Sequence, residues 1–263
     1  MADYKQETGL ALEMARAAAA IILPYFQSSG LQVESKQDNS PVTIADRGAE
    51  EALRKLMEKH TPGYGIIGEE FGSQPGKADR EWVIDPIDGT KAFIHGVPLF
   101  GTLLALLEGG KPVVGVISLP ALGQVMHASL GNGCFLDGKP CRVSAVGRIE
   151  DALLLDGSST TMERLGHGAA WAALRKRAKL HRGWGDCYGH MLVSCGRAEA
   201  MVDPVVSVWD VAPLGVILPE AGGRFSALSG KDSIYEGNGV SSNGAIHAEI
   251  LRAMAAPPGP TNP

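Results

Sequence analysis

The chain has 263 residues, of which 44% are hydrophobic and 20% are charged, and its formal net charge is −5 at pH 7. These proportions are those of a folded globular protein and exclude disorder over most of the chain. The net negative charge, without any block rich in lysine and arginine, gives no electrostatic support to a nucleic-acid-binding face. A phosphorylated substrate would need a bound cation to overcome the acidic surroundings.

The cysteines and histidines show no pattern typical of a metal site. Cys134, Cys141, Cys187 and Cys195 lack Cys-x-x-Cys spacing, so we expect free thiols in a reducing compartment. The seven histidines show no metal-ligand spacing, and surface or core positions are expected for them. The longest apolar run near the N-terminus, residues 17–23, is too short to cross a bilayer. We therefore expect a cytoplasmic protein with no membrane or nucleic-acid partner.

Two amphipathic helices are predicted near the start of the chain. Apolar residues recur at helical intervals over residues 7–26 and again over residues 47–60. Asp46 stands just before the second helix, where an acidic residue caps the helix or lies in its first turn. A role for Asp46 in supporting a catalytic water is the alternative.

A buried strand ends in the run WVIDPIDGTKAF, residues 82–93. Asp85 and Asp88 lie on either side of a proline, which makes the chain turn and can bring both carboxylates to one side. A carbonyl between them, that of Ile87, would complete three oxygen ligands of the kind that suits Mg²⁺.

Gly89 and Thr90 continue this run toward a phosphate site. Glycine lets a ligand approach the backbone closely, and Thr90 is expected to open a helix whose free amides face an anion. The same run is also an ordinary turn sequence, which leaves a purely structural role open. The preceding strand, residues 65–67, ends close to Glu69, which completes a carboxylate cluster if the two strands are neighbours. The polar segment 71–80 is expected to be a mobile loop.

The remainder of the chain predicts a sheet of hairpins followed by alternating strands and helices. Strands are expected at residues 101–108, 113–118, 124–129, 134–136, 152–155, near Leu180 and at 200–203, and helices at 160–179 and 191–195. Trp209 begins a run, WDVAP, that is typical of a helix start. We expect Asp210 at its N-cap, from which a carboxylate can also bind a metal, and Pro213 in its first turn.

Three separate segments resemble the inositol monophosphatase-like, Mg²⁺-dependent phosphatases. They are Gly68-Glu69-Glu70, the run WVIDPIDGT, and WDVAP followed by Glu220-Ala221-Gly222-Gly223. The resemblance implies an α+β fold, a layered αβαβα sandwich of the inositol monophosphatase/fructose-1,6-bisphosphatase type, usually found as a homodimer. We expect one phosphatase domain, residues 1–256, with subdomains of roughly 1–145 and 146–256, and a disordered tail at 257–263.

The resemblance also implies the roles of the site residues. The ligands of two or three Mg²⁺ ions would be Glu69, Asp85, Asp88, Asp210 and the carbonyl of Ile87. Thr90 and Glu69, supported by Asp46, would position and deprotonate a water that attacks the phosphorus in line. The amides of Gly89 and Thr90 would hold phosphate oxygens, with Lys36 nearby in a supporting role.

Substrate contacts beyond the phosphate are implied for Asp88, Asp186 and Asp203. Asp186 occupies a position that is small and uncharged in the animal inositol enzymes, and an anion there favours a cationic substrate. The runs Gly-Asp-Cys-Tyr at 185–188 and PLFGTLLALL at 98–107 look more like the histidinol-phosphatase branch than the inositol branch. We therefore predict a phosphoric monoester hydrolase that acts on L-histidinol phosphate in histidine biosynthesis.

Four other interpretations stay open. An inositol-1-phosphate phosphatase would use the same metal site and offer hydroxyls to Asp203. A bisphosphate nucleotidase would need a basic pocket, for which His181, Arg182 and Lys91 are candidates. A haloacid-dehalogenase-type phosphatase has Asp-x-Asp-Gly-Thr, whereas this chain has one more residue between the aspartates. A non-catalytic regulatory or RNA-associated protein would be expected to lack metal-ligating aspartates, and none is missing.

Overall fold

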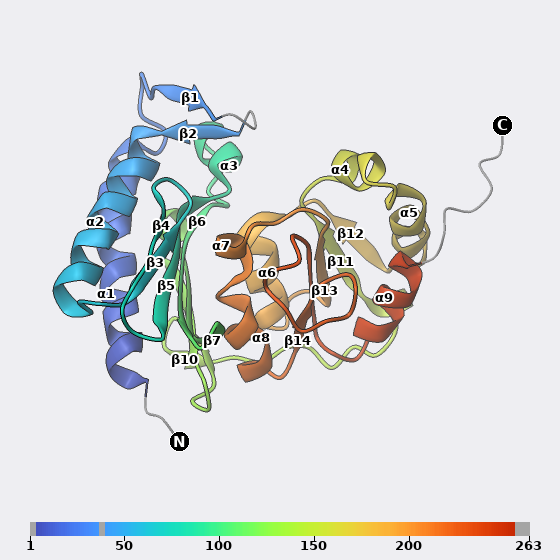
Figure 1. The fold of residues 1–263 in the computed structure, drawn as a ribbon. Coiled ribbons are helices and arrows are strands. Elements are labelled where there is room, and N and C mark those ends of the chain that lie inside the picture. The colour runs from blue at the N-terminus through green and yellow to red at the C-terminus, as the bar shows by residue number, and fades with distance from the viewer. Residues whose placement is uncertain (1–3, 37–39, 256–263) are drawn as a thin grey trace.

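The structure is a computed structural model that describes residues 4–36 and 40–255. Its elements form layers in the order helices, sheet, helices, sheet, helices (Figure 1). This is the layered αβαβα sandwich expected from the sequence. The expected boundary near residue 145 falls in the segment that joins the two large sheets, and the tail expected at 257–263 lies outside the described residues.

The first layer consists of α1 (Lys5–Ile22) and α2 (Ile44–His60), which pack side by side against the larger sheet. In α2 the buried apolar residues are Ala45, Ala49, Leu53 and Met57, a spacing of four that forms one stripe along a helix. A small ribbon of β1 (Val33–Ser35) and β2 (Pro41–Thr43) leads into α2.

The larger sheet has the strand order β10-β9-β8-β7-β6-β5-β3-β4. Its strands are β3 (Gly65–Gly68), β4 (Gly72–Gln74), β5 (Arg80–Asp88), β6 (Gly101–Glu108), β7 (Lys111–Leu119), β8 (Gln124–Ser129), β9 (Cys134–Leu136) and β10 (Lys139–Pro140). Only the pair β3 and β5 is parallel among these described strands. The segment 71–80 is not simply a loop as expected, because β4 lies within it and pairs with β3.

The second sheet has the order β12-β11-β13-β15-β14. Its strands are β11 (Leu153–Asp156), β12 (Leu180–Arg182), β13 (Ala200–Asp203), β14 (Arg224–Ser226) and β15 (Gly239–Ser242). Because β11, β12 and β13 are parallel, their carboxyl ends meet at one edge. At that edge Asp203 lies close to Gly157, which follows β11, and Asp156 lies close to Gly185, which follows β12.

The two sheets enclose a central helical layer of α6 (Asp186–Ser194), α7 (Val208–Val211) and α8 (Leu214–Glu220). Buried residues of both sheets and these helices form one core cluster, for example Leu103, Met191, Met201 and Ile217. Burial of these apolar surfaces is the main stabilising force in such a sandwich.

The outer layer on the far side consists of α4 (Ser159–Arg164), α5 (Gly168–Arg177) and α9 (His247–Met254) (Figure 1). We expected one helix over 160–179. Gly166 instead adopts a φ of 81°, which a continuing right-handed helix does not permit, and the chain forms two helices. Short 3₁₀ helices occupy Leu23–Tyr25, Pro120–Leu122 and Ile149–Asp151.

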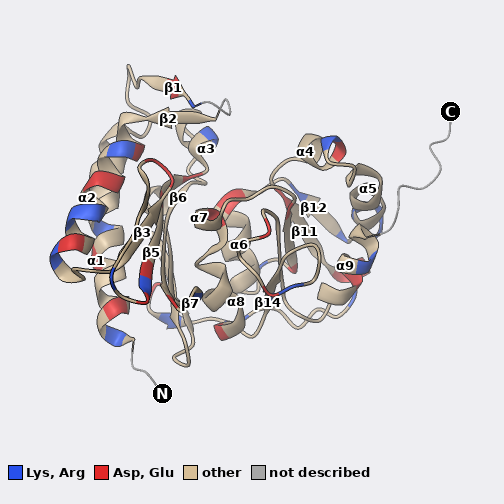
Figure 2. Cartoon of the chain, viewed as in Figure 1, with Lys and Arg blue, Asp and Glu red and all other residues tan. Residues whose placement is uncertain are grey.

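The described structure agrees with two further expectations. All four cysteines are free thiols. No described helix combines the length and the hydrophobicity needed to cross a membrane. In the view of Figure 2, lysine and arginine are scattered over several elements and do not gather in one block.

Candidate metal and phosphate site

The site begins where the parallel strands β3 and β5 end. Gly68 lies opposite Ile84 in the register, so Glu69 and Asp85 follow at equivalent points of neighbouring strands. The amide of Glu69 donates to the Ile84 carbonyl at 3.3 Å. The pairing of β5 with β6 is irregular between Asp85 and Asp88, where the proline interrupts the ladder. The two acidic strand ends are therefore neighbours, as the cluster hypothesis required.

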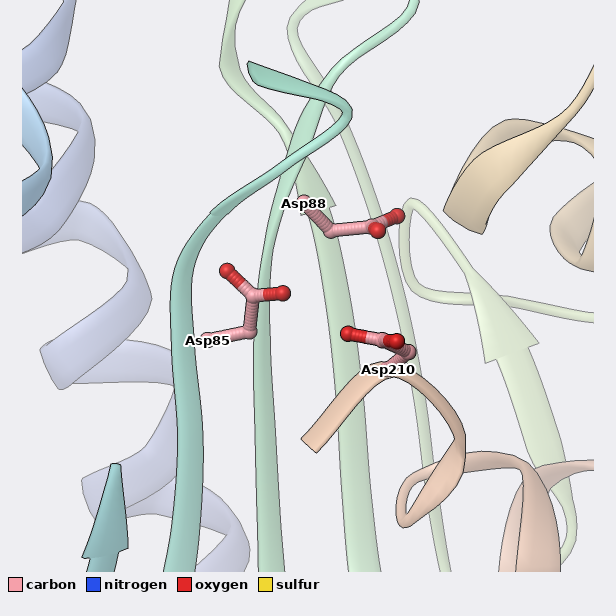
Figure 3. Close-up of side chains that lie close together, drawn as sticks. All are labelled: Asp85, Asp88 and Asp210. Atoms are coloured by element: carbon pink, nitrogen blue, oxygen red, sulfur yellow. The ribbon is translucent and has the colours of Figure 1, made fainter. Parts of the chain in front are cut away.

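Three aspartates from two elements point toward one another in Figure 3. Asp85 and Asp88 come from the end of β5 and Asp210 from α7, and one carboxylate oxygen of each lies within 4.8 Å of the others. Asp85 is only 1% exposed, and its Oδ1 is buried without any hydrogen-bond partner among the described residues. An orphaned carboxylate oxygen beside two further carboxylates fits a bound divalent cation with oxygen ligands.

The electrostatics of this cluster point the same way. Burial, followed by the charges of Glu69, Asp88 and Asp210, raises the pKa of Asp85 well above its usual value. Burial and the charges of Asp186 and Asp210 likewise raise the pKa of Asp88. Burial raises the pKa of Asp210 to about 7, against the lowering effect of the Ser207 amide. Such mutual repulsion is relieved by protons or by a cation.

Asp210 is not the N-cap of its helix, as we had expected. Ser207 is the N-cap of α7, and Asp210 occupies the third helical position, where its Oδ2 accepts from the Ser207 amide at 2.7 Å. Pro213 precedes α8 instead of lying in the first turn after Asp210. The Ser-x-x-Asp spacing of a capping box explains the shift, since it holds one carboxylate oxygen and leaves the other to face the cluster.

Asp46 lies in the same position of α2, three residues after the N-cap Thr43. Its Oδ2 accepts from the amide and the hydroxyl of Thr43 at 2.8 and 2.6 Å. Its Oδ1 lies 3.5 Å from Oγ1 of Thr90, and that hydroxyl also donates to the Ile87 carbonyl at 2.9 Å. Asp46 is therefore a first-turn acid, and it contacts the threonine proposed for catalysis.

Thr90 opens α3 (Thr90–Ile94) directly after Gly89, which has a φ of 80°. A Cβ on Gly89 would lie 3.1 Å from the Leu99 carbonyl and 3.2 Å from Oδ2 of Asp186. Both the backbone conformation and the space therefore require glycine at this point. Figure 1 places α3 beside β2, above the end of β5.

Glu69 lies beside the three aspartates, close enough to raise the pKa of Asp85, and its carboxylate also pairs with Lys36. The Lys36 ammonium donates to Glu69 and to Glu70, each at 2.7 Å. Burial alone would lower the pKa of Lys36, but its bonds to the two glutamates outweigh burial and raise it. Burial raises the pKa of Glu70 to about 7 in spite of Lys36. Lys36 thus neutralises part of the negative charge beside the aspartate cluster.

A pocket opens beside the aspartate cluster toward the second sheet. Its lining residues are Asp88, Asp186, Cys187, His190, Asp203, Val205, Val206 and Asp210. Asp186 is an exposed residue with a φ of 54°, and it lines the pocket. Desolvation there and the charge of Asp203 raise the pKa of Asp186 to about 6, against opposing effects of His190 and Lys91. The pocket therefore presents two neighbouring carboxylates, those of Asp186 and Asp203, next to the aspartate cluster.

Sequence reasoning missed two groups in this pocket. His190 is buried, and its ring nitrogens lie 3.1 Å from Oδ2 of Asp203 and 2.7 Å from the Ser241 hydroxyl. The Cys187 amide donates to Oδ2 of Asp88 at 2.5 Å. The available signal for His190 was its position four residues after Asp186, on the same face of a helix.

The three residues considered for a second phosphate are not gathered in one basic pocket of the described structure. The His181 ring lies 3.1 Å from Oδ2 of Asp156, and Arg182 donates to the His181 carbonyl. Lys91 lies near enough to Asp186 to lower its pKa.

Residues 3–256 match the family model described as the inositol monophosphatase family. The chain belongs to this family. Its relatives include the histidinol-phosphatase of Chlorobaculum parvum, 45% identical over 93% of this chain and 95% of that protein. The histidinol-phosphatase of Mycobacterium tuberculosis is 39% identical over 94% and 97%. A solved inositol monophosphatase from Zymomonas mobilis has a TM-score of 0.85 and 33% identity over 97% of this chain and all of that one.

Membership of the inositol monophosphatase family confirms three of the expectations drawn from the sequence. They are the family itself, the layered α+β fold and the enzyme class, a phosphoric monoester hydrolase. The haloacid-dehalogenase alternative is therefore excluded. The histidinol-phosphatases are more similar to this chain than the solved inositol enzyme from Zymomonas, as expected from residues 185–188.

Proposed function

We propose that the protein is a Mg²⁺-dependent phosphomonoesterase that hydrolyses L-histidinol phosphate to L-histidinol and phosphate. The observation that carries this proposal is the pair of carboxylates, Asp186 and Asp203, in the same pocket as Asp88 and Asp210. The 45% identity with a protein named histidinol-phosphatase supports it. We further propose that the protein works in the cytoplasm and that it forms a homodimer, the second of which the family resemblance implies.

In this proposal Glu69, Asp85, Asp88, Asp210 and the carbonyl of Ile87 hold two or three Mg²⁺ ions. The orphaned Oδ1 of Asp85 is the best support for such a site. The bound cations would neutralise phosphate charge and make water a stronger acid. Glu69 can be a ligand only if its carboxylate binds the cation while it also accepts the hydrogen bond from Lys36.

The residues around Thr90 would prepare the attacking water. The Thr90 hydroxyl can donate its hydrogen bond to the Ile87 carbonyl or to Asp46, which leaves its oxygen free to accept a hydrogen bond from water. Glu69 would then accept the second proton of that water as it attacks the phosphorus. The amides of Gly89 and Thr90 would hold the phosphate oxygens in line with the attack.

The pocket beyond the phosphate would select the alcohol part of the substrate. The amine of histidinol phosphate is cationic near neutral pH and would make charge-assisted hydrogen bonds with Asp186 and Asp203. An inositol phosphate would offer only hydroxyls, which leave the repulsion between the two carboxylates unrelieved. This difference favours the cationic substrate over inositol 1-phosphate.

The test is phosphate release by the purified protein with Mg²⁺, with kcat/KM compared for three substrates. L-histidinol phosphate should exceed inositol 1-phosphate and adenosine 3′,5′-bisphosphate by about tenfold or more, which is about 1.4 kcal/mol of transition-state discrimination. A higher kcat/KM for inositol 1-phosphate would overturn the substrate proposal but not the proposed metal chemistry. Absence of Mg²⁺-dependent release from all three would overturn both.

A further inference from the structure

The turn that carries Glu69 is held by two side chains from a different element. Residues 69–71 connect β3 to β4, which begins at Gly72, and two side chains of α2 reach this turn. Glu50 and Arg54 of α2 contact the backbone of this turn at three points. Figure 2 shows α2 with acidic and basic bands along its length.

Glu50 is fully buried, although it is a carboxylate. Its Oε2 accepts from the Glu70 amide at 2.7 Å, and its Oε1 accepts from the Phe71 amide at 3.2 Å. The guanidinium of Arg54 neutralises it, with Nη2 lying 2.8 Å from Oε1. A buried charge satisfied in this way is strongly destabilised when one partner is removed.

Arg54 extends the contact to the far end of the turn. Its Nη2 also donates to the Gly72 carbonyl at 2.5 Å, and its guanidinium lies 5.9 Å from the centre of the Phe71 ring. The turn is therefore held at residues 70, 71 and 72 by a single ion pair. None of these contacts uses the Glu69 side chain.

The spacing along α2 links this ion pair to the catalytic region. Asp46, Glu50 and Arg54 are separated by four residues each, so they lie on one face of the helix. Asp46 contacts Thr90 from the first turn, and the next two turns hold the segment that bears Glu69. Gly68 permits this approach, since a Cβ there would lie 2.1 Å from Oε1 of Glu50.

We propose that Glu50 and Arg54 are positioning residues that fix the Glu69 carboxylate relative to Asp85 and thereby set the metal affinity of the site. The role of Glu69 as a ligand rests on the proposed function, whereas the holding of the turn rests on the contacts above. A turn released from α2 would present Glu69 in the binding geometry only part of the time. The apparent dissociation constant would then rise in inverse proportion to that fraction.

The test compares Glu50→Gln with Glu51→Gln, a matched control on the same helix. Glu51 also forms an ion pair with the residue four positions on, Lys55 at 2.7 Å, but both side chains are exposed. Two quantities are measured: hydrogen exchange of the Glu70 and Phe71 amides in metal-free protein, and Mg²⁺ affinity by calorimetric titration. Glu50→Gln should raise both the exchange rate and the dissociation constant about tenfold or more, and Glu51→Gln less than about twofold.

A milder variant covers the case in which Glu50→Gln does not fold. Arg54→Lys keeps the charge but loses the fork that reaches both Glu50 and Gly72, and it should raise the Mg²⁺ dissociation constant about threefold. Unchanged metal affinity in a folded variant with faster exchange would overturn the positioning role. Equal acceleration of amides throughout the protein would also overturn it, by showing that Glu50 acts only on global stability.

Failure of the proposed function would look different. If the unmodified protein bound no Mg²⁺ at millimolar concentration, the metal site would be wrong. The exchange rates at Glu70 and Phe71 would still decide whether Glu50 and Arg54 hold the turn.

Discussion

The two sheets present their acidic residues in different ways. At the end of β5, Asp85 keeps a buried oxygen that has no partner among the described residues. At the end of β13, Asp203 has its Oδ2 engaged by His190, which is fixed in turn by Ser241. The unpartnered oxygen of Asp85 is available to bind a metal ion, whose bonds to oxygen are not strongly directional. The carboxylate of Asp203 is held in one orientation, so it can orient a substrate group by a directional hydrogen bond. Under the proposed function, the end of the first sheet would therefore hold the metal and the end of the second would orient the substrate.

The strongest test of this division is Asp85→Asn. We expect kcat with Mg²⁺ to fall about a thousandfold or more, because a buried ligand becomes a neutral amide. The melting temperature of the metal-free protein should rise, since the substitution removes one of several mutually repelling charges. Steady-state kinetics and calorimetry measure both. Asp151→Asn, at an exposed carboxylate, is the control, and near-normal activity of Asp85→Asn would remove Asp85 from the ligand set.

Asp186→Asn should weaken the preference for the cationic substrate and leave the hydrolysis of other phosphate esters nearly unchanged. We expect kcat/KM for L-histidinol phosphate to fall about tenfold to a hundredfold, through loss of one charge-assisted bond to the amine. Hydrolysis of p-nitrophenyl phosphate, which has no cationic group, should change less than about threefold. Equal losses on the two substrates would show that Asp186 does not recognise the cation.

The pH dependence of the free energy of unfolding should also distinguish the aspartate cluster from the pocket region around Asp203. The folded-state pKa values of Asp85, Asp88 and Asp210 are raised by burial, that of Asp210 to about 7. Carboxyl groups with raised pKa values hold protons in the folded state that the unfolded chain releases above about pH 4. Metal-free protein should therefore lose stability from these groups as the pH rises from about 4 to 7.

Mg²⁺ competes with those protons, so the rise in melting temperature that it causes should be larger at pH 8 than at pH 5.5. Thermal scans at both pH values, with and without Mg²⁺, measure this difference. Asp210→Asn should reduce the difference between the Mg²⁺-induced rises in melting temperature at the two pH values. Asp203→Asn should leave most of that difference. A Mg²⁺ effect that is the same at both pH values would argue against binding by the buried aspartates.

The smallest effect is expected at Gly157. A Cβ at this position would lie 3.0 Å from Oδ1 of Asp203, which is closer than an ordinary contact. Gly157→Ala should shift that carboxylate slightly and raise KM for L-histidinol phosphate about threefold, with kcat nearly unchanged. The same assay on Gly147→Ala provides a control, since nothing lies within 4 Å of the corresponding Cβ. An unchanged KM would mean that the position of Asp203 is not critical.

The boundaries of an element can be predicted from the local sequence where local interactions determine them. The hairpin strands at 101–108, 124–129 and 134–136 have the predicted boundaries, because glycine-rich turns delimit them. The capping box Ser-x-x-Asp was also present in the sequence, but Asp210 was read as the cap itself. Gly166 likewise breaks a predicted helix at a residue whose effect was readable.

Other features depend on contacts between distant segments, and no local pattern encodes them. The bond between His190 and Asp203 requires α6 to pack on β13. The contact of Glu50 with the turn after β3 joins residues 20 positions apart. The family motifs identified the candidate ligands, yet they did not show that Glu69 pairs with Lys36 in this structure.

The hydrogen bond from the Cys187 amide to Asp88 joins the aspartate cluster to helix α6. Because its donor belongs to the main chain, every residue except proline can supply it at this position. The bond therefore does not depend on the side-chain chemistry of residues 186 and 187. Asp186→Asn should leave this main-chain link in place, so a loss of substrate selectivity in that variant would report on the carboxylate alone.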